Sequence, residues 1–84
     1  MNKIVEVSAI WCPSCLVMRP IYERIYKKYN LCVTKLDYDT DDISEYNVGN
    51  ILPVLIIGDK RFIGEVKEKE IVDYLEGCNL WKNI

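Results

Sequence analysis

The feature that most constrains the fold of this chain is a pair of cysteines, Cys12 and Cys15, placed where one hydrophobic pattern gives way to another. Residues 3–8 are rich in β-branched side chains and predict a buried strand. Residues 13–29 repeat apolar side chains at intervals of four with charged residues between them, which predicts an amphipathic helix. Pro13 suits the first turn of that helix, because an N–H group there has no intrahelical partner. The two cysteines therefore lie where a strand turns into a helix.

The middle of the chain continues the alternation of helix and strand. Pro20 lies inside the first helix and predicts a kink, and Asn30 predicts the end of that helix. Residues 31–36 carry β-branched side chains after a short turn and predict a second strand. Thr40 is followed by two aspartates, a pattern typical of a helix start, so we expect a short helix from Thr40 to about Tyr46.

The last part of the chain predicts a hairpin and a final helix. Residues 54–57 and 60–63 flank a Gly-Asp dipeptide that is compatible with a tight turn. Residues 67–76 place apolar side chains on one side and meet Gly77, a residue suited to a helix C-terminus. Residues 78–84 show no clear pattern.

Taken in order, the elements follow β-α-β-α-β-β-α and predict an α/β fold. The arrangement expected is a four-stranded mixed β-sheet flanked by three helices, with helices on both faces. Right-handed crossovers leave few other arrangements. A chain of 84 residues has room for one compact domain, so we expect a single domain spanning residues 1–84.

Charge and hydropathy exclude several classes of function. The chain has 11 Lys and Arg against 13 Asp and Glu, so it lacks the basic excess of a typical nucleic-acid-binding protein of this size. Residues 1–10 include Lys3 and Glu6 and therefore resemble neither a secretory signal nor a membrane span. We expect a cytoplasmic protein that binds neither nucleic acid nor membrane, with a monomer as the default state.

The cysteine content allows three interpretations: two disulfides, a four-sulfur metal site, or one reactive pair with two packed thiols. The four residues are Cys12, Cys15, Cys32 and Cys78. A reducing cytosol disfavours structural disulfides, and the chain has one close pair where zinc knuckles usually have two. The absence of histidine also favours thiol redox chemistry, although half of a metal site or two incidental thiols stay open. The apolar neighbours of Cys32 and Cys78 predict packed thiols.

The position of the pair offers a physical reason for reactivity. The thiolate is the nucleophile, whereas a free thiol is mostly protonated near neutral pH. A cysteine at the start of a helix faces unpaired N–H groups and the positive end of the helix dipole, and both favour the anion. Cys12 is so placed, and the two-residue spacer brings Cys15, one helical turn further on, within bonding reach. Attack and resolution can therefore share one turn of helix.

The segment Trp11-Cys-Pro-Ser-Cys-Leu-Val-Met-Arg-Pro20 resembles the thioredoxin signature, with Trp before the pair and Pro eight residues after the first Cys. The resemblance extends through the rest of the helix, to Lys35 in the second strand and to Pro53 ahead of a buried strand. It implies the thioredoxin fold in a minimal form, without the extra strand and helix with which that fold normally begins. In size the chain is closer to glutaredoxins and the smallest thioredoxin-like proteins.

The resemblance also implies roles for individual residues. Cys12 corresponds to the attacking thiol and Cys15 to the buried resolving thiol, joined in a reversible Cys12–Cys15 disulfide. Pro53 corresponds to the cis-proline beside the pair, which would present the backbone of Leu52 to an extended substrate segment. The remaining residues expected at the substrate-binding surface are Trp11, Pro13 and Ser14.

Two charged residues correspond to a proton relay in that family. Glu6 lies six residues before Cys12, where thioredoxins bury an aspartate beneath the disulfide. Lys35 corresponds to the lysine near that acid and would modulate it. The alternatives are that Glu6 points to solvent from its strand and that Lys35 is an ordinary surface residue.

Three functions from different classes are compatible with the sequence. The leading hypothesis is a protein-disulfide reductase of thioredoxin type, which needs no cofactor or metal of its own and takes electrons from a thioredoxin-reductase-like flavoprotein or another dithiol donor. The second is a glutaredoxin-like enzyme that uses glutathione, but glutaredoxins carry Thr-Val before the cis-proline and a double glycine later, where this chain has Ile51-Leu52 and Gly64-Glu65. The third is a metal-binding or interaction module on the same fold.

Overall fold

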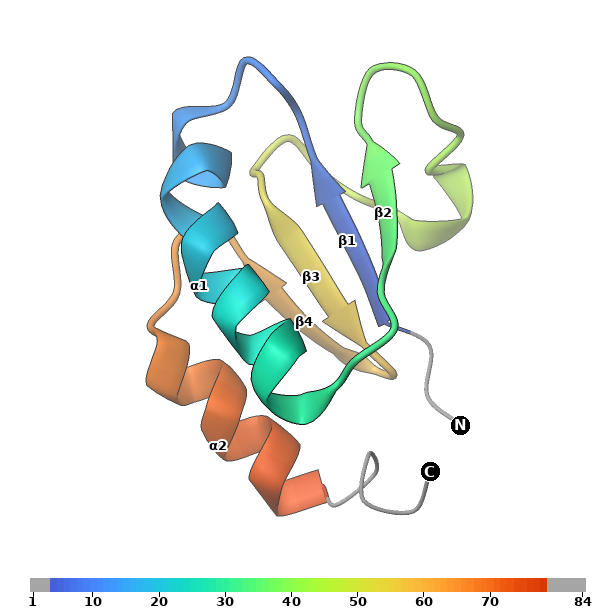
Figure 1. Cartoon of the computed structure of the whole chain (residues 1–84). Coiled ribbons are helices and arrows are strands. Elements are labelled where there is room, and N and C mark those ends of the chain that lie inside the picture. The colour runs from blue at the N-terminus through green and yellow to red at the C-terminus, as the bar shows by residue number, and fades with distance from the viewer. Residues whose placement is uncertain (1–3, 79–84) are drawn as a thin grey trace.

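The computed structural model describes residues 4–78, together with all their side chains except that of Cys78. Its elements in chain order are β1 (Ile4–Ser8), α1 (Pro13–Tyr29), β2 (Thr34–Asp37), the 3-10 helix η1 (Ser44–Tyr46), β3 (Val54–Ile57), β4 (Lys60–Ile63) and α2 (Glu68–Cys78) (Figure 1). The first strand was predicted from residue 3, which lies outside the described residues, as does most of the unassigned tail. No helix within the described range is long and apolar enough to cross a membrane.

The four strands form one mixed sheet in the order β2-β1-β3-β4, which confirms the predicted sheet. β1 runs parallel to β2 and antiparallel to β3, and β3 forms an antiparallel hairpin with β4. β1 is therefore an interior strand, and the chain leaves its carboxyl end directly into the segment that carries the cysteine pair. Gly58 has φ 58° in the hairpin turn, a left-handed conformation that glycine adopts without steric strain.

Both α-helices cover the same face of the sheet (Figure 1). Because side chains alternate across a strand, one set from the sheet faces α1 and α2 and the other set faces away. The core on the helical side includes Ile4, Leu55 and Phe62 from the sheet, Tyr22 from α1 and Ile71 from α2. These apolar contacts fix α1 against β1.

The opposite face carries a second core, and no α-helix of residues 4–78 covers it. The sheet residues Val5, Val7, Val54 and Ile56 are buried here beneath Leu36, Tyr38, Ile43, Tyr46 and Val48. These covering residues come from the end of β2, the three-residue η1 and the loops around it. The expectation of three helices over both faces is therefore corrected in one respect: the described residues form two α-helices, both on one face, and the short 3-10 helix η1 with the loops around it covers the other.

α1 begins and ends as predicted. The Cys12 side chain accepts a hydrogen bond from the backbone N–H of Cys15 and so caps the first turn, with Pro13 at the first helical position. Asn30 closes the helix in the left-handed conformation, with φ 54°. The helix continues through Pro20, which has no N–H to donate.

The predicted second strand and second helix differ from the observed ones. β2 begins at Thr34 rather than at residue 31, because its pairing with β1 starts where Thr34 lies opposite Val5. Thr40 caps no helix. The carboxylate of Asp37 accepts hydrogen bonds from the backbone N–H groups of Asp39 and Thr40, and this local turn replaces the predicted first helical turn.

The final helix is displaced slightly from its predicted range. α2 begins at Glu68, and the backbone N–H of Lys67 donates to the side chain of Glu70, which satisfies one free donor at this helix start. Helical conformation passes through Gly77 to Cys78, so Gly77 does not end the helix as predicted.

Candidate active site

The two cysteines lie at the junction of β1 and α1, at the carboxyl end of an interior strand. Both thiols are free, and each residue is only 6% exposed. The Cys12 sulfur accepts a hydrogen bond from the Cys15 backbone N–H at 3.3 Å. Its thiol donates to the carbonyl oxygen of Leu52 at 3.6 Å. Hydrogen bonds from N–H groups at a helix start stabilise sulfur anions, so Cys12 has the surroundings expected of a nucleophile.

Cys15 lies one turn further along α1 and has different surroundings. Burial raises the pKa of the Cys15 thiol from 9.0 to about 11, with further contributions from its hydrogen bond with Cys12 and from the negative charges of Cys12 and Glu6. Cys15 therefore stays protonated at neutral pH. Of the two thiols, Cys12 is the one suited to the first attack.

The segment before β3 forms one wall of the site. The Leu52–Pro53 peptide bond is cis, the geometry that the resemblance implied for Pro53. Leu52 and Pro53 are both buried, and the Pro53 carbonyl accepts a hydrogen bond from the Gly64 N–H at 2.8 Å. The Leu52 carbonyl faces the Cys12 thiol, so a substrate strand that pairs with Leu52 would lie directly beside the sulfur. That pairing stays a prediction.

Two carboxylates hold Trp11, which precedes the pair, and Ser14, which lies between the two cysteines. The Trp11 indole N–H donates to Asp39 Oδ2 at 2.5 Å, although Trp11 is 57% exposed. The Ser14 hydroxyl donates to Glu65 Oε2 at 2.8 Å. Sequence analysis missed Asp39 and Glu65, because they lie 28 and 51 residues from their partners and no local pattern links them.

Exposed apolar side chains surround the pair. Ile10 and Trp11 precede Cys12, and Leu16 follows Cys15. Ile51, which precedes Leu52, is also exposed and lies next to Gly64. A Cβ atom built on Gly64 would be 3.4 Å from Cγ2 of Ile51. The thiols therefore open onto an apolar surface rather than into a deep pocket. Pro13, inside the motif, is exposed as well.

Glu6 is buried on the face of the sheet that α1 covers, which excludes the alternative that it points to solvent. The residue is 9% exposed, and the hydroxyl of Tyr26 donates to its Oε1 at 2.7 Å. Lys35 lies opposite Glu6 in the β1–β2 register, but its Nζ pairs with Glu23 Oε2 at 2.7 Å. Lys35 and Glu6 therefore interact through their charges without a hydrogen bond. The roles of relay and modulator stay predictions.

The chain is similar to known proteins over most of its length. The profile of the thioredoxin family matches residues 1–77. The chain belongs to the thioredoxin family. It is 32% identical over 80 residues to a thioredoxin of Coprinus comatus, a match that covers 90% of this chain and 68% of that protein.

Solved thioredoxin structures share the fold. A mutant thioredoxin from Halobacterium salinarum NRC-1 superposes with a TM-score of 0.79 at 23% identity, covering 90% of this chain and 73% of that one. A reduced thioredoxin pre-protein of Schistosoma mansoni gives a TM-score of 0.75 at 22% identity, covering 90% and 77%. The α/β thioredoxin fold is thus confirmed, and family and fold together make this protein a thiol-disulfide oxidoreductase in general terms.

Cys32 of this thioredoxin-family chain lies apart from the pair, beyond the other end of α1. Cys32 is exposed in the segment between α1 and β2, so the prediction of a packed thiol is wrong. Its neighbours Leu31 and Val33 turn toward the core instead, which leaves the side chain between them on the outside. The side chain of Cys78 lies outside the described part of the chain. Among the side chains that are described, no three His, Cys, Asp or Glu gather as a metal site.

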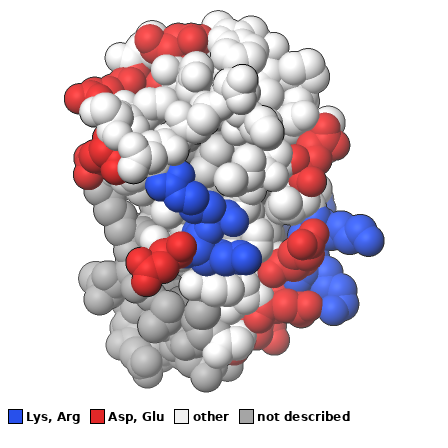
Figure 2. Space-filling view, turned by 180° about the vertical axis from the view of Figure 1, so that it is seen from behind, with Lys and Arg blue, Asp and Glu red and all other residues white. Residues whose placement is uncertain are grey.

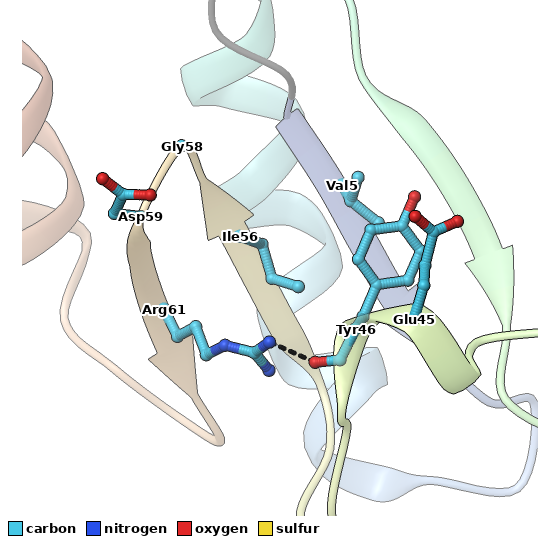
Figure 3. Close-up of a pocket in the computed structure, with 7 residues that line it drawn as sticks. All are labelled: Val5, Glu45, Tyr46, Ile56, Gly58, Asp59 and Arg61. Atoms are coloured by element: carbon cyan, nitrogen blue, oxygen red, sulfur yellow. Dashed lines mark hydrogen bonds between the residues drawn. The ribbon is translucent and has the colours of Figure 1, made fainter.

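A hollow of about 290 Å³ lies on the face of the thioredoxin-fold sheet that faces away from the α-helices (Figure 3). Val5 and Ile56 form its floor, and the Arg61 guanidinium donates to the backbone carbonyl of Tyr46 across it. The hollow extends toward the β3–β4 turn, away from the end of the sheet where Cys12 lies. It contains no thiol, so it is not part of the candidate active site.

The same face carries both signs of charge. Figure 2 shows Lys and Arg side chains lying beside Asp and Glu among the described residues of this view. Such an interspersed surface provides no broad positive field for a nucleic-acid backbone.

Proposed function

We propose that this protein reduces disulfide bonds in other proteins through a reversible disulfide between Cys12 and Cys15. The observation that carries the proposal is the contrast between the two thiols. Cys12 accepts an N–H hydrogen bond at the start of α1, whereas burial keeps Cys15 protonated. A two-step exchange requires one thiol that attacks first and a second thiol that stays protonated until the mixed disulfide has formed.

In the first step the Cys12 thiolate attacks one sulfur of the substrate disulfide. A mixed disulfide forms between Cys12 and that sulfur, the substrate S–S bond breaks, and the other substrate sulfur leaves as a thiolate that takes a proton from solvent. In the second step Cys15 gives up its proton and attacks the Cys12 sulfur. The Cys12–Cys15 disulfide forms, the mixed disulfide breaks, and the second substrate thiol is released. Two electrons pass from the protein to the substrate.

Glu6 is the proposed acceptor of the proton that Cys15 loses. It is buried between β1 and α1, and its charge acts on the Cys15 thiol. A nearby base matters because a residue that is 6% exposed has little contact with the bulk water that would otherwise take its proton. Lys35, whose charge interacts with Glu6 while it pairs with Glu23, is the proposed modulator of this acid.

The proposed substrates are proteins with an accessible disulfide in an extended, apolar segment. The exposed side chains of Ile10, Trp11 and Ile51 offer apolar contact of this kind. Pro13 and Ser14 border the same surface, and the Leu52 backbone lies beside the Cys12 sulfur. Such contacts are tolerant of sequence, which suits a general reductase.

A flavoprotein of thioredoxin-reductase type, or another dithiol donor, is the proposed source of electrons. Two carboxylates, those of Asp39 and Glu65, accept hydrogen bonds from Trp11 and Ser14 beside the two thiols. Glutathione carries two carboxylates of its own, so like charges disfavour it at this surface. We further propose a cytoplasmic location, because a reducing compartment would keep Cys12 and Cys15 available as thiols. A monomer stays the default expectation.

Reduction of insulin disulfides tests the proposal. The protein is assayed once with NADPH and thioredoxin reductase and once with millimolar glutathione and glutathione reductase, with Cys12→Ser as the inactive control. We expect rapid turnover in the first system, slow turnover in the second and none for the variant. Faster turnover with glutathione would move the protein into the glutaredoxin-like class, and equal activity of Cys12→Ser would remove the pair from the mechanism.

A further inference from the structure

A buried hydrogen bond behind the cysteine pair involves a residue that the exchange steps above do not use. Tyr26 of α1 is 8% exposed, and its hydroxyl donates to Oε1 of Glu6 at 2.7 Å. The ring of Tyr22, one turn earlier on α1, stacks on that of Tyr26 with centroids 6.1 Å apart and planes 21° from parallel. The Tyr22 hydroxyl is buried and has no hydrogen-bond partner among the described residues.

Helical spacing places these tyrosines on the same face of α1 as Cys15. Tyr22 follows Cys15 by seven residues and Tyr26 follows it by eleven, which corresponds to about two and three turns. The groups that face Glu6 are thus Cys15, Tyr22 and Tyr26 from α1, together with the charge of Lys35 from β2. On the other side, β3 places the apolar Leu55 opposite Glu6.

A carboxylate in such a site depends on its hydrogen-bond donor. Burial disfavours a charged carboxyl group, and a donated hydrogen bond compensates by stabilising the ionised form. Lys35 does not supply that bond, because its Nζ is engaged with Glu23. Tyr26 does supply it, from a hydroxyl that packing against the core holds in place.

We propose that Tyr26 is a positioning residue for thiol-disulfide exchange, because its hydroxyl holds the Glu6 carboxylate where it can take the proton of Cys15. The inference rests on the proposed function and extends it. When Cys15 attacks the Cys12 sulfur, the Cys15 proton passes to the Glu6 carboxylate, and Glu6 later returns it to solvent. Without the Tyr26 hydroxyl, the Glu6 carboxylate loses the hydrogen bond that holds it in this place.

The chain offers a matched control for this role. Tyr26→Phe keeps the buried ring and removes the donor to Glu6. Tyr22→Phe is the same substitution on the same helical face, but it removes a hydroxyl that has no hydrogen-bond partner. A general effect of removing a buried hydroxyl from α1 should appear in both variants, whereas an effect that acts through Glu6 should appear only in Tyr26→Phe.

Two measurements separate the outcomes. The first is the pH titration of the reduced Cys15 thiol, followed by NMR with ¹³Cβ-labelled cysteine, which needs no substrate. The second is the rate at which a mixed disulfide between Cys12 and a small aromatic thiol is resolved at neutral pH, measured by stopped flow. Each is applied to the unmodified protein, to Tyr26→Phe, Tyr22→Phe and Glu6→Gln, and to the double variant Glu6→Gln/Tyr26→Phe.

We expect Tyr26→Phe to lower the pKa of Cys15, because the negative charge of Glu6 no longer raises it. Resolution should slow by about tenfold, since a hydrogen bond to a charged group is lost. Glu6→Gln should have the same two effects, the double variant should add nothing further, and Tyr22→Phe should leave both measurements unchanged. Equal behaviour of Tyr26→Phe and Tyr22→Phe, or multiplied effects in the double variant, would overturn the inference.

The titration keeps this test independent of the proposed function. If the unmodified protein fails to reduce insulin but the Cys15 titration responds to Tyr26→Phe as expected, the assigned reaction is wrong and the control of Cys15 through Glu6 stands. If insulin is reduced and Tyr26→Phe leaves the pKa of Cys15 unchanged, the positioning role alone is refuted.

Discussion

The ionisation of Cys15 should make the stability of the reduced protein depend on pH in a defined window. The pKa of this thiol is about 11 in the folded state against an ordinary value of 9.0, chiefly because the residue is buried. The thiolate is the charged form, so the folded state holds the proton more tightly than the unfolded chain does. The stability that results is fully present below pH 9 and is lost as pH rises toward 11.

The size of the effect follows from these two values. At pH 10 the unfolded thiol is largely ionised and the folded one is not, which changes the folding equilibrium about tenfold and lowers the free energy of unfolding by roughly 1 kcal/mol. Well above pH 11 the loss approaches about 3 kcal/mol, the full value for two pKa units. Tyr22 and Tyr26 also have raised pKa values from burial, so alkaline pH destabilises the fold through them as well.

Urea unfolding of the protein under a phosphine reductant, at pH 7 and at pH 10, measures this loss. The matched control is Cys15→Ala, which retains both tyrosines and so cancels their contribution. Between the two pH values the unmodified protein should lose roughly 1 kcal/mol more than the variant. An identical loss of unfolding free energy in the two proteins would show that Cys15 titrates alike in the folded and unfolded chains. The argument that burial keeps the resolving thiol protonated would then be wrong.

Further predictions concern the pair and the core of α1. Cys12→Ser should abolish disulfide reduction, whereas Cys15→Ser should accumulate mixed disulfides that mass spectrometry detects as adducts, because the nucleophile remains without its resolving partner. A mixed disulfide that accumulates on Cys12→Ser instead would show that Cys15 is the nucleophile and Cys12 the resolving thiol. Tyr22→Phe should raise the free energy of unfolding by roughly 1 kcal/mol, because it removes a buried hydroxyl without a partner, and chemical denaturation would show a loss instead if that hydroxyl were satisfied.

The features predicted correctly depend on short-range signals. The range of α1 follows from Pro13 at its start and Asn30 at its end, and both residues act within a single turn of the chain. The β3–β4 hairpin follows in the same way from the glycine in its turn. The placement of Cys12 at the junction of strand and helix combines two such local patterns, so it too could be read from the sequence.

The features predicted incorrectly depend on contacts between distant segments. Thr40 and Asp37 are both able to cap a turn, and the pairing of β2 with β1 places Asp37 where its carboxylate takes the N–H groups first. Nothing local to α1 or α2 indicates that the two helices share one face of the sheet. Cys32 is exposed for a similar reason, since its apolar neighbours on either side are the residues that pack against the core.

The buried position of Glu6 is intermediate between these cases. A strand pattern with Glu6 between two valines indicates only that it points to the opposite face from them. Whether that face of the sheet is exposed to solvent or buried depends on α1, which packs against it and provides the Tyr26 hydroxyl. The tyrosine at that position is visible in the sequence, but its partner is not.

Residues 38–52, between β2 and β3, form an irregular cover on the second sheet face. This cover should govern how often the thiol pair becomes accessible. Regular structure in this cover is limited to η1, and segments of this kind open locally at lower free energy than the strands and helices around them. The cover starts near Asp39, which anchors Trp11, and ends at Leu52, which contacts Cys12. One local opening would therefore release both flanks of the pair while β1 and α1 stay folded. Amide hydrogen exchange in this cover and alkylation of Cys12 should accordingly report the same opening equilibrium.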